Sequence, residues 1–204
     1  MEDSARPVLS IRPIASNDAA SGLIVPPAPP VCTTDRDTVA INGSTYALAH
    51  VRPFSVNIEH FDQAKYRAIK LVVTFSHHCF SQEIKRGDDP THFIVEDGEP
   101  RRFCAERHAW SSDLANLVRY HVNGKAYESR DGNGIWNHFF YAADGRTIPY
   151  AIYFRLTQAT NIPGVDGVLH VVSAYENSQL LPRHKYQSVR FAMHAGKLIG
   201  FKAK

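Results

Sequence analysis

The 204-residue sequence has only three cysteines, and they do not form a Cys-x-x-Cys pair. A small, odd number of cysteines argues against a disulfide framework and favours a reducing compartment. No apolar run approaches the roughly 20 residues that cross a bilayer. The acidic opening "MEDSARPVLS" lacks the apolar core of a secretory signal. We therefore expect a cytoplasmic protein without a membrane partner.

Motifs for nucleotide-dependent chemistry are also missing. The sequence has no phosphate-cradling glycine loop, nucleophile elbow or dinucleotide fingerprint. Acidic residues end at Glu176, whereas basic residues continue to the C-terminus. Such a basic end predicts contact with RNA or with an acidic protein partner, and the alternative is an ordinary solvated surface. The basic residues are Arg183, Lys185, Arg190, Lys197, Lys202 and Lys204.

Prolines divide the chain into a tail and a domain. Half of the twelve prolines lie within the first 30 residues, several of them in "IVPPAPPV". This composition favours an extended segment that buries little apolar area, so residues 1–36 are predicted to be a disordered tail. Residues 37–204 are predicted to form a single α+β domain.

Alternating apolar and polar residues dominate the predicted domain. They predict a curved, mostly antiparallel sheet with one or two helices packed on a face. Asn42-Gly43 and Asp144-Gly145 predict tight hairpins, and a last bend is expected at Ala195-Gly196. "SSDLANLVRYHV" has the apolar spacing of a helix, with Ser111 or Ser112 as its cap.

"YRAIKLVVTFSHHCF" predicts one strand that runs to Phe80. Side chains alternate between the two faces of a strand, so His77 and Cys79 share the face of Leu71, whereas His78 faces the other way. We expect Cys79 to be buried and His78 to meet solvent or substrate.

Cysteine and histidine spacing allows a zinc site. His77 and Cys79 share a strand face, and Cys104 and His108 lie four residues apart, so these four residues together offer a tetrahedral set. The alternatives are that both cysteines are core residues, or that Cys79 is a nucleophile with a histidine base.

The eleven histidines allow acid–base chemistry without a cofactor. An imidazole titrates near neutral pH, so two of them can serve as base and acid in RNA cleavage by the 2′-hydroxyl. Only a cation beside the phosphate is needed in addition. We take His78 and His170 as candidate catalytic residues, with Arg155, Arg183 and Lys185 as candidate cations.

Three C-terminal segments, "IPYAIYFRLTQA", "VLHVVSAYENS" and "HKYQSVRF", resemble the sheet of RelE-like and barnase–EndoU–colicin-type ribonuclease toxins. The resemblance implies a metal-independent ribonuclease with His170, Tyr175, Arg183 and Lys185 near the phosphate. Two alternatives stay open. One is a non-enzymatic binding or regulatory protein, of phage or mobile-element type, that contacts nucleic acid or protein. The other is a zinc-binding protein.

Overall fold

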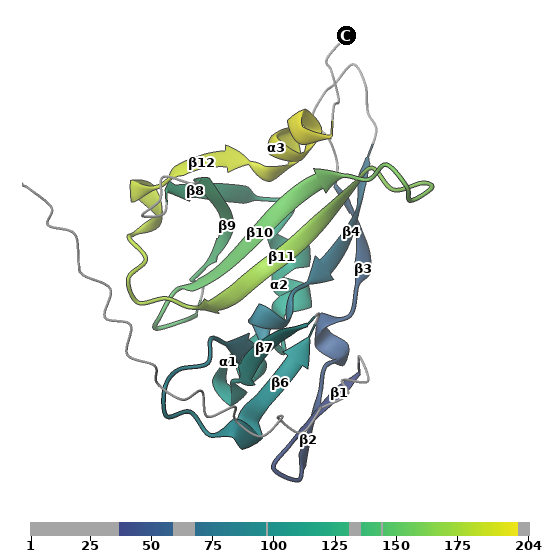
Figure 1. Ribbon diagram of the computed structural model, residues 1–204. Coiled ribbons are helices and arrows are strands. Elements are labelled where there is room, and N and C mark those ends of the chain that lie inside the picture. The colour runs from purple at the N-terminus through teal and green to yellow at the C-terminus, as the bar shows by residue number, and fades with distance from the viewer. Residues whose placement is uncertain (1–36, 59–67, 97, 131–135, 144, 200–204) are drawn as a thin grey trace, which may run out of the picture.

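A curved seven-stranded sheet runs through the computed structural model (Figure 1). The structure describes residues 37–58, 68–96, 98–130, 136–143 and 145–199. The predicted tail, residues 1–36, lies outside them. The sheet order is β12-β8-β9-β10-β11-β4-β3, and only the β4–β11 pair is parallel. Its strands are β3 (Phe54–Ile58), β4 (Ile69–Phe75), β8 (Lys125–Arg130), β9 (Trp136–Ala142), β10 (Tyr150–Gln158), β11 (Gly167–Glu176) and β12 (Gln187–Arg190).

Two smaller sheets lie beyond one end of the large sheet (Figure 1). Strands β1 (Thr38–Ile41) and β2 (Ser44–Ala47) form the predicted Asn42-Gly43 hairpin, in which both turn residues have positive φ. The second small sheet has the order β5-β7-β6. Its strands are β5 (Ser81–Gln82), β6 (Phe93–Glu96) and β7 (Glu99–Phe103).

The described residues form three α-helices beside the sheets: α1 (Ala105–Ser111), α2 (Leu114–His121) and α3 (Phe191–Leu198). Leu114 and Val118 of α2 and Phe191 of α3 enter the same core as the sheet residues Phe140 and Ile152. Helices α2 and α3 therefore cover one face of the large sheet. We call the opposite face, which carries Tyr153, the outer face. This arrangement confirms the predicted α+β class with a mostly antiparallel sheet.

The strand that begins at residue 69 ends earlier than predicted. Strand β4 stops at Phe75, and His77–Cys79 form a 3-10 helix, η2, whose first turn is capped by Ser76 Oγ accepting from His78 N at 3.2 Å. The prediction of a strand to Phe80 is thus wrong. Cys79 is nevertheless buried in the core with Leu71, as expected. His78 is the more exposed histidine, with 30% of its side chain accessible against 7% for His77.

The C-terminal segment is also helical where a hairpin was expected. Phe191, Ala192, Ala195 and Gly196 are buried and form one face of α3, so Ala195-Gly196 lies within a helix and not at a bend. Helix α2 was predicted correctly, but its N-cap residue is Asp113, and Ser111 belongs to α1. Three further 3-10 turns are η1 (Ala49–Val51), η3 (Pro90–His92) and η4 (Arg183–Lys185). Among the described residues, no helix is long and apolar enough to cross a membrane.

Candidate functional site

A bulge in β11 decides which of its side chains reach the outer face. Tyr153 pairs with Ser173, but the next residue, Phe154, pairs with Val171, so Val172 has no partner on β10. His170 and Tyr175 are five residues apart and would face opposite ways on a regular strand. Because of the bulge, the side chains of His170 and Tyr175 both lie on the outer face. On β10, His170 pairs with Arg155 and Tyr175 pairs with Ala151.

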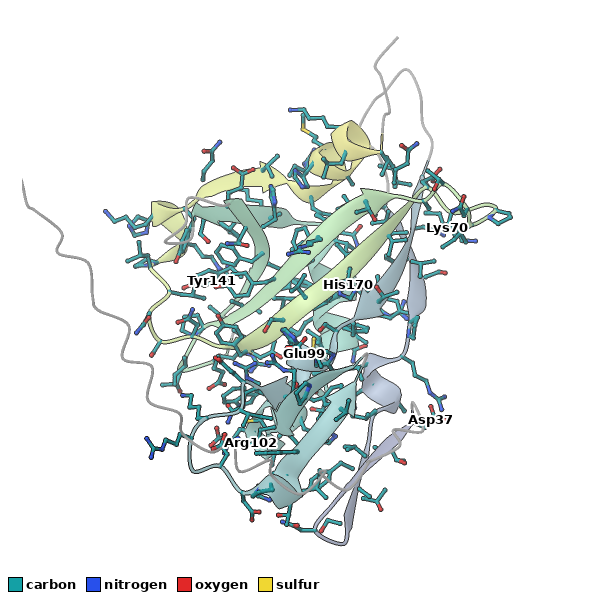
Figure 2. All side chains as sticks on the ribbon, in the orientation of Figure 1. Asp37, Lys70, Glu99, Arg102, Tyr141 and His170 are labelled. Carbon is teal, nitrogen blue, oxygen red and sulfur yellow. The ribbon has the colours of Figure 1, made fainter. Side chains whose placement is uncertain are left out.

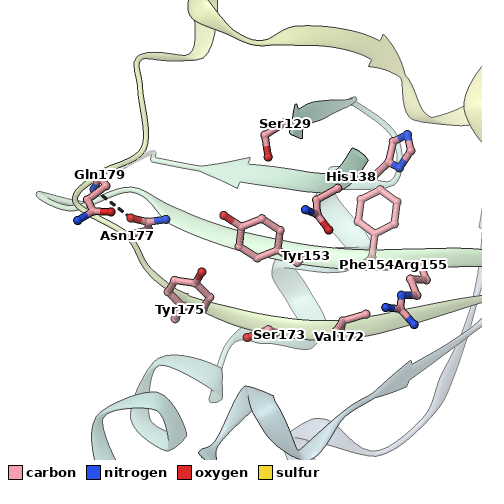
Figure 3. Close-up of a pocket in the computed structure, with 11 residues that line it drawn as sticks. Ser129, His138, Tyr153, Phe154, Arg155, Val172, Ser173, Tyr175, Asn177 and Gln179 are labelled. Carbon is pink, nitrogen blue, oxygen red and sulfur yellow. Dashed lines mark hydrogen bonds between the residues drawn. The ribbon is translucent and has the colours of Figure 1, made fainter. Parts of the chain in front are cut away.

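A polar pocket of about 640 Å³ opens on this outer face (Figure 3). Tyr153 and Tyr175 stack at its centre, with ring centroids 5.7 Å apart, and burial followed by the neighbouring Tyr175 raises the pKa of Tyr153. Arg155 lies at one end of the pocket. Among the described residues, the lining contains no carboxylate, which suits a neutral or anionic ligand with planar groups. The lining residues are Ser129, Asn137, His138, Tyr153, Phe154, Arg155, Val172, Ser173, Tyr175, Asn177 and Gln179.

His170 lies between strands β10 and β4, next to this pocket. Its Cα partners are Arg155 on one side and Thr74 on the other, and Thr74 Oγ1 is 2.9 Å from Nδ1 of the imidazole. Burial, then the charge of Arg155 and then that of His78, lower the pKa of His170 below its ordinary 6.5. The ring is therefore neutral at pH 7. When Nδ1–H donates to Thr74, Nε2 keeps the lone pair of a general base.

His78 approaches His170 from η2 and has a carboxylate beside it. Its Nε2 is 3.6 Å from Oε2 of Glu99, whose Oε1 accepts a 3.0 Å hydrogen bond from Arg101 Nη1. Burial and then Arg101 lower the pKa of His78, whereas Glu99 acts in the opposite direction. Glu99 thus partly opposes the lowering of the His78 pKa, whereas the described groups that shift the His170 pKa include no carboxylate.

Arg107 connects η2 with the tyrosine end of the pocket. Its Nη1 donates to the carbonyl oxygens of His78 at 3.2 Å and Ser81 at 2.8 Å, and its guanidinium lies 4.9 Å from the ring centroid of Tyr175. We call His78, Glu99, Arg107, His170 and Tyr175 the junction site, because β11 meets the small sheet there. Figure 2 shows His170 on β11 and Glu99 on the small sheet next to it.

The two predicted C-terminal cations lie elsewhere. Arg183 donates from Nη2 to the Tyr141 carbonyl at 3.3 Å, and Lys185 lies on the same turn, η4. Tyr141 pairs with Ala151, four residues along β10 from Arg155. That separation is about 14 Å at roughly 3.4 Å per residue. Of the five predicted catalytic residues, His78 and His170 lie nearest each other, since the charge of His78 acts on His170. Tyr175 pairs with Ala151 and so lies a similar distance along the sheet from His170, but Arg107 links it to the His78 turn. Arg183 and Lys185 belong to η4, beside Tyr141.

The predicted zinc set does not assemble. Among the described residues, no three of His77, Cys79, Cys104 and His108 bring donor atoms within 4.8 Å of one another. His108 Nε2 is instead 2.8 Å from the Ala47 carbonyl of the first hairpin. Burial raises the pKa of the Cys79 thiol to about 12, which also removes this residue as a nucleophile.

Two other clusters, among the described residues, have three possible metal ligands within 4.8 Å. One is His77, His78 and Glu99, where the Arg101 guanidinium already binds the carboxylate and opposes a cation. The other is Glu128, His138 and His194. Glu99, Arg107, Glu128 and His194 were not predicted from the sequence as functional residues.

Comparison with known proteins identifies one relationship. The comparison with curated proteins gave no match, and neither did that with solved structures. Residues 38–199 match the YjaZ family, and this range includes every strand of the large sheet and the whole junction site. The chain therefore belongs to the YjaZ family.

Proposed function

We propose that the protein cleaves RNA without a metal ion, with the junction site as its catalytic centre. The observation that carries the proposal is the position of η2, with His78, against β11 beside His170. The backbone N–H of Ser76 donates to the Val171 carbonyl at 2.9 Å, and the charge of His78 acts on His170. Arg155 is the strand partner of His170 and also lines the pocket. Its guanidinium can therefore hold a phosphate between the two imidazoles. The resemblance of the C-terminal strands to ribonuclease toxins supports the same chemistry.

The two histidines have different tasks in this mechanism. Neutral His170 takes the proton of the 2′-hydroxyl, and the oxygen attacks the adjacent phosphorus. His78 acts in its protonated form and gives its proton to the departing 5′-oxygen, and the Glu99 carboxylate partly offsets the burial and the Arg101 charge that lower the His78 pKa. The products are a 2′,3′-cyclic phosphate and a free 5′-hydroxyl. Arg155 stabilises the charge that develops on the phosphate oxygens, and a base can stack on the tyrosines of the pocket.

Incubation of the purified full chain with end-labelled RNA tests this function. We expect cleavage that persists in excess EDTA and leaves 2′,3′-cyclic phosphate ends, since no step uses a metal. Identification of the ends by phosphatase sensitivity distinguishes this chemistry from metal-dependent hydrolysis, which leaves a 3′-hydroxyl or a simple phosphate. Binding of RNA without cleavage would contradict the proposal and favour a non-enzymatic RNA-binding protein instead.

A further inference from the structure

We propose that Glu128, His138 and His194 form a binding site for a divalent transition metal ion that fastens helix α3 to the sheet. This site is separate from the junction site. The three donor atoms lie within 4.8 Å of one another, and two imidazoles with one carboxylate suit zinc and related ions.

The strand pairing fixes two of the three ligands. Glu128 on β8 and His138 on β9 are Cα partners in an antiparallel pair, and Glu128 Oε1 is 3.3 Å from His138 Nε2. Two ligands on one tetrahedral zinc ion are also about 3.3 Å apart, given bonds of about 2.0–2.1 Å. This pair is thus already spaced as two ligands of one ion.

Core packing of α3 fixes the third ligand. Phe191, at the start of α3, contacts Phe140 and Phe154 with ring centroids 5.1 and 5.5 Å away. Its backbone N–H donates to the Gly124 carbonyl at 3.0 Å. These contacts anchor the helix, and they place the His194 ring 4.2 Å from the His138 ring, centroid to centroid.

The electrostatics of the cluster also suit a cation. Burial, followed by the charge of His138, lowers the pKa of His194 to about 4, so this ring is neutral at pH 7 and keeps a lone pair. The carboxylate of Glu128 supplies a negative charge that raises the pKa of His194, whereas Lys197, one turn along α3, lowers it less than His138 does. The side chains of Glu128 and His138 are 21% and 26% exposed, which leaves a path for an ion.

Titration of the metal-stripped full chain with Zn²⁺, in competition with a chromophoric chelator, tests the proposal. We expect one equivalent to bind at this site and to raise the melting temperature. His138→Ala and Glu128→Gln should each weaken the affinity about 100-fold, because loss of an outer-shell partner alone costs about 10–100-fold. Substituting Co²⁺ should give the visible absorption of a low-symmetry site in the wild type only.

Three controls make the result decisive. Glu128→Gln keeps the size of the side chain, and circular dichroism of each metal-free variant shows whether it is folded. The ring of His92 contacts the Asn42 side chain in the turn of the β1–β2 sheet, away from the cluster. The His92→Ala variant should therefore bind zinc as the wild type does. Zinc binding that survives in both cluster variants, or that is lost instead in His78→Ala, would overturn the proposal. Cleavage of RNA in EDTA is scored separately, so failure of this site leaves the proposed ribonuclease activity standing.

Discussion

Replacing His170 by glutamine is expected to slow RNA cleavage by about 10²–10⁴-fold, the usual contribution of a positioned general base. Glutamine keeps polar atoms near Thr74 Oγ1, which lies 2.9 Å from the imidazole, but it cannot take up a proton. The fold should therefore persist while the chemistry is lost. Single-turnover cleavage of a short labelled RNA, under saturating protein, measures the effect apart from RNA binding.

His184→Ala is the matched control for this substitution. His184 is an exposed histidine on η4, beside the Arg183 that binds the Tyr141 carbonyl, and it has no part in the junction site. Its loss should leave the cleavage rate within about twofold of the wild type. Equal rates for His170→Gln and the wild type would remove His170 from the mechanism.

Replacing Phe191 by alanine is expected to lower the free energy of unfolding by about 3–5 kcal/mol, the range for a buried phenylalanine. Phe191 is fully buried and contacts both Phe140 and Phe154, so its loss leaves a cavity between α3 and the sheet. Equilibrium unfolding in urea, monitored by circular dichroism, measures the change.

Met193 provides the comparison on the same helix. Its side chain is 49% exposed, and Met193→Ala should change the free energy of unfolding by less than about 0.5 kcal/mol. Similar stabilities for the two variants would show that residues 191–198 do not pack as a helix on the core. A hairpin with its bend at Ala195-Gly196 would then be the better account.

Local patterns were sufficient to predict most of the fold. Asn42-Gly43 defined the first hairpin, and the alternation in Phe54–Ile58 matches a half-buried strand in the structure. The C-terminal helix could not be predicted in this way, because "SVRFAMHAGK" fits both a strand pair and a helix. Only its packing on Phe140 and Phe154 decides between them. Tertiary packing of this kind often overrides local preference.

The candidate site depended more on long-range structure. Alternation placed Cys79 in the core and His78 outside, and both positions hold, although the backbone there is a 3-10 helix. The joint placement of His170 and Tyr175 depends on the bulge at Val172, for which the sequence has no visible signal. Glu99 contacts His78, 21 residues earlier in the chain, whereas Arg107 contacts Tyr175, 68 residues later, so the second contact depends on how the small sheet meets β11.

The arginines in and beside the junction site favour binding of an anion. Burial, followed by Arg155, lowers the pKa of His170, and burial, followed by Arg101 and then Arg107, lowers that of His78. These shifts show that each histidine lies in a field that disfavours a further positive charge. A phosphate bound at Arg155 would offset that field and make it easier for His78 to carry the proton that the mechanism requires.

The most direct test of the junction site is a titration of its two histidines by NMR, with resonances assigned by comparison with His78→Gln and His170→Gln. We predict that both rings titrate below 6.5 in the free protein, because burial and neighbouring arginines disfavour their protonated forms. In His78→Gln, the pKa of His170 should rise toward 6.5 but stay below it, since burial and Arg155 remain. A His170 that titrates at or above 6.5, or that is unaffected by the loss of His78, would contradict the pairing on which the proposed mechanism depends.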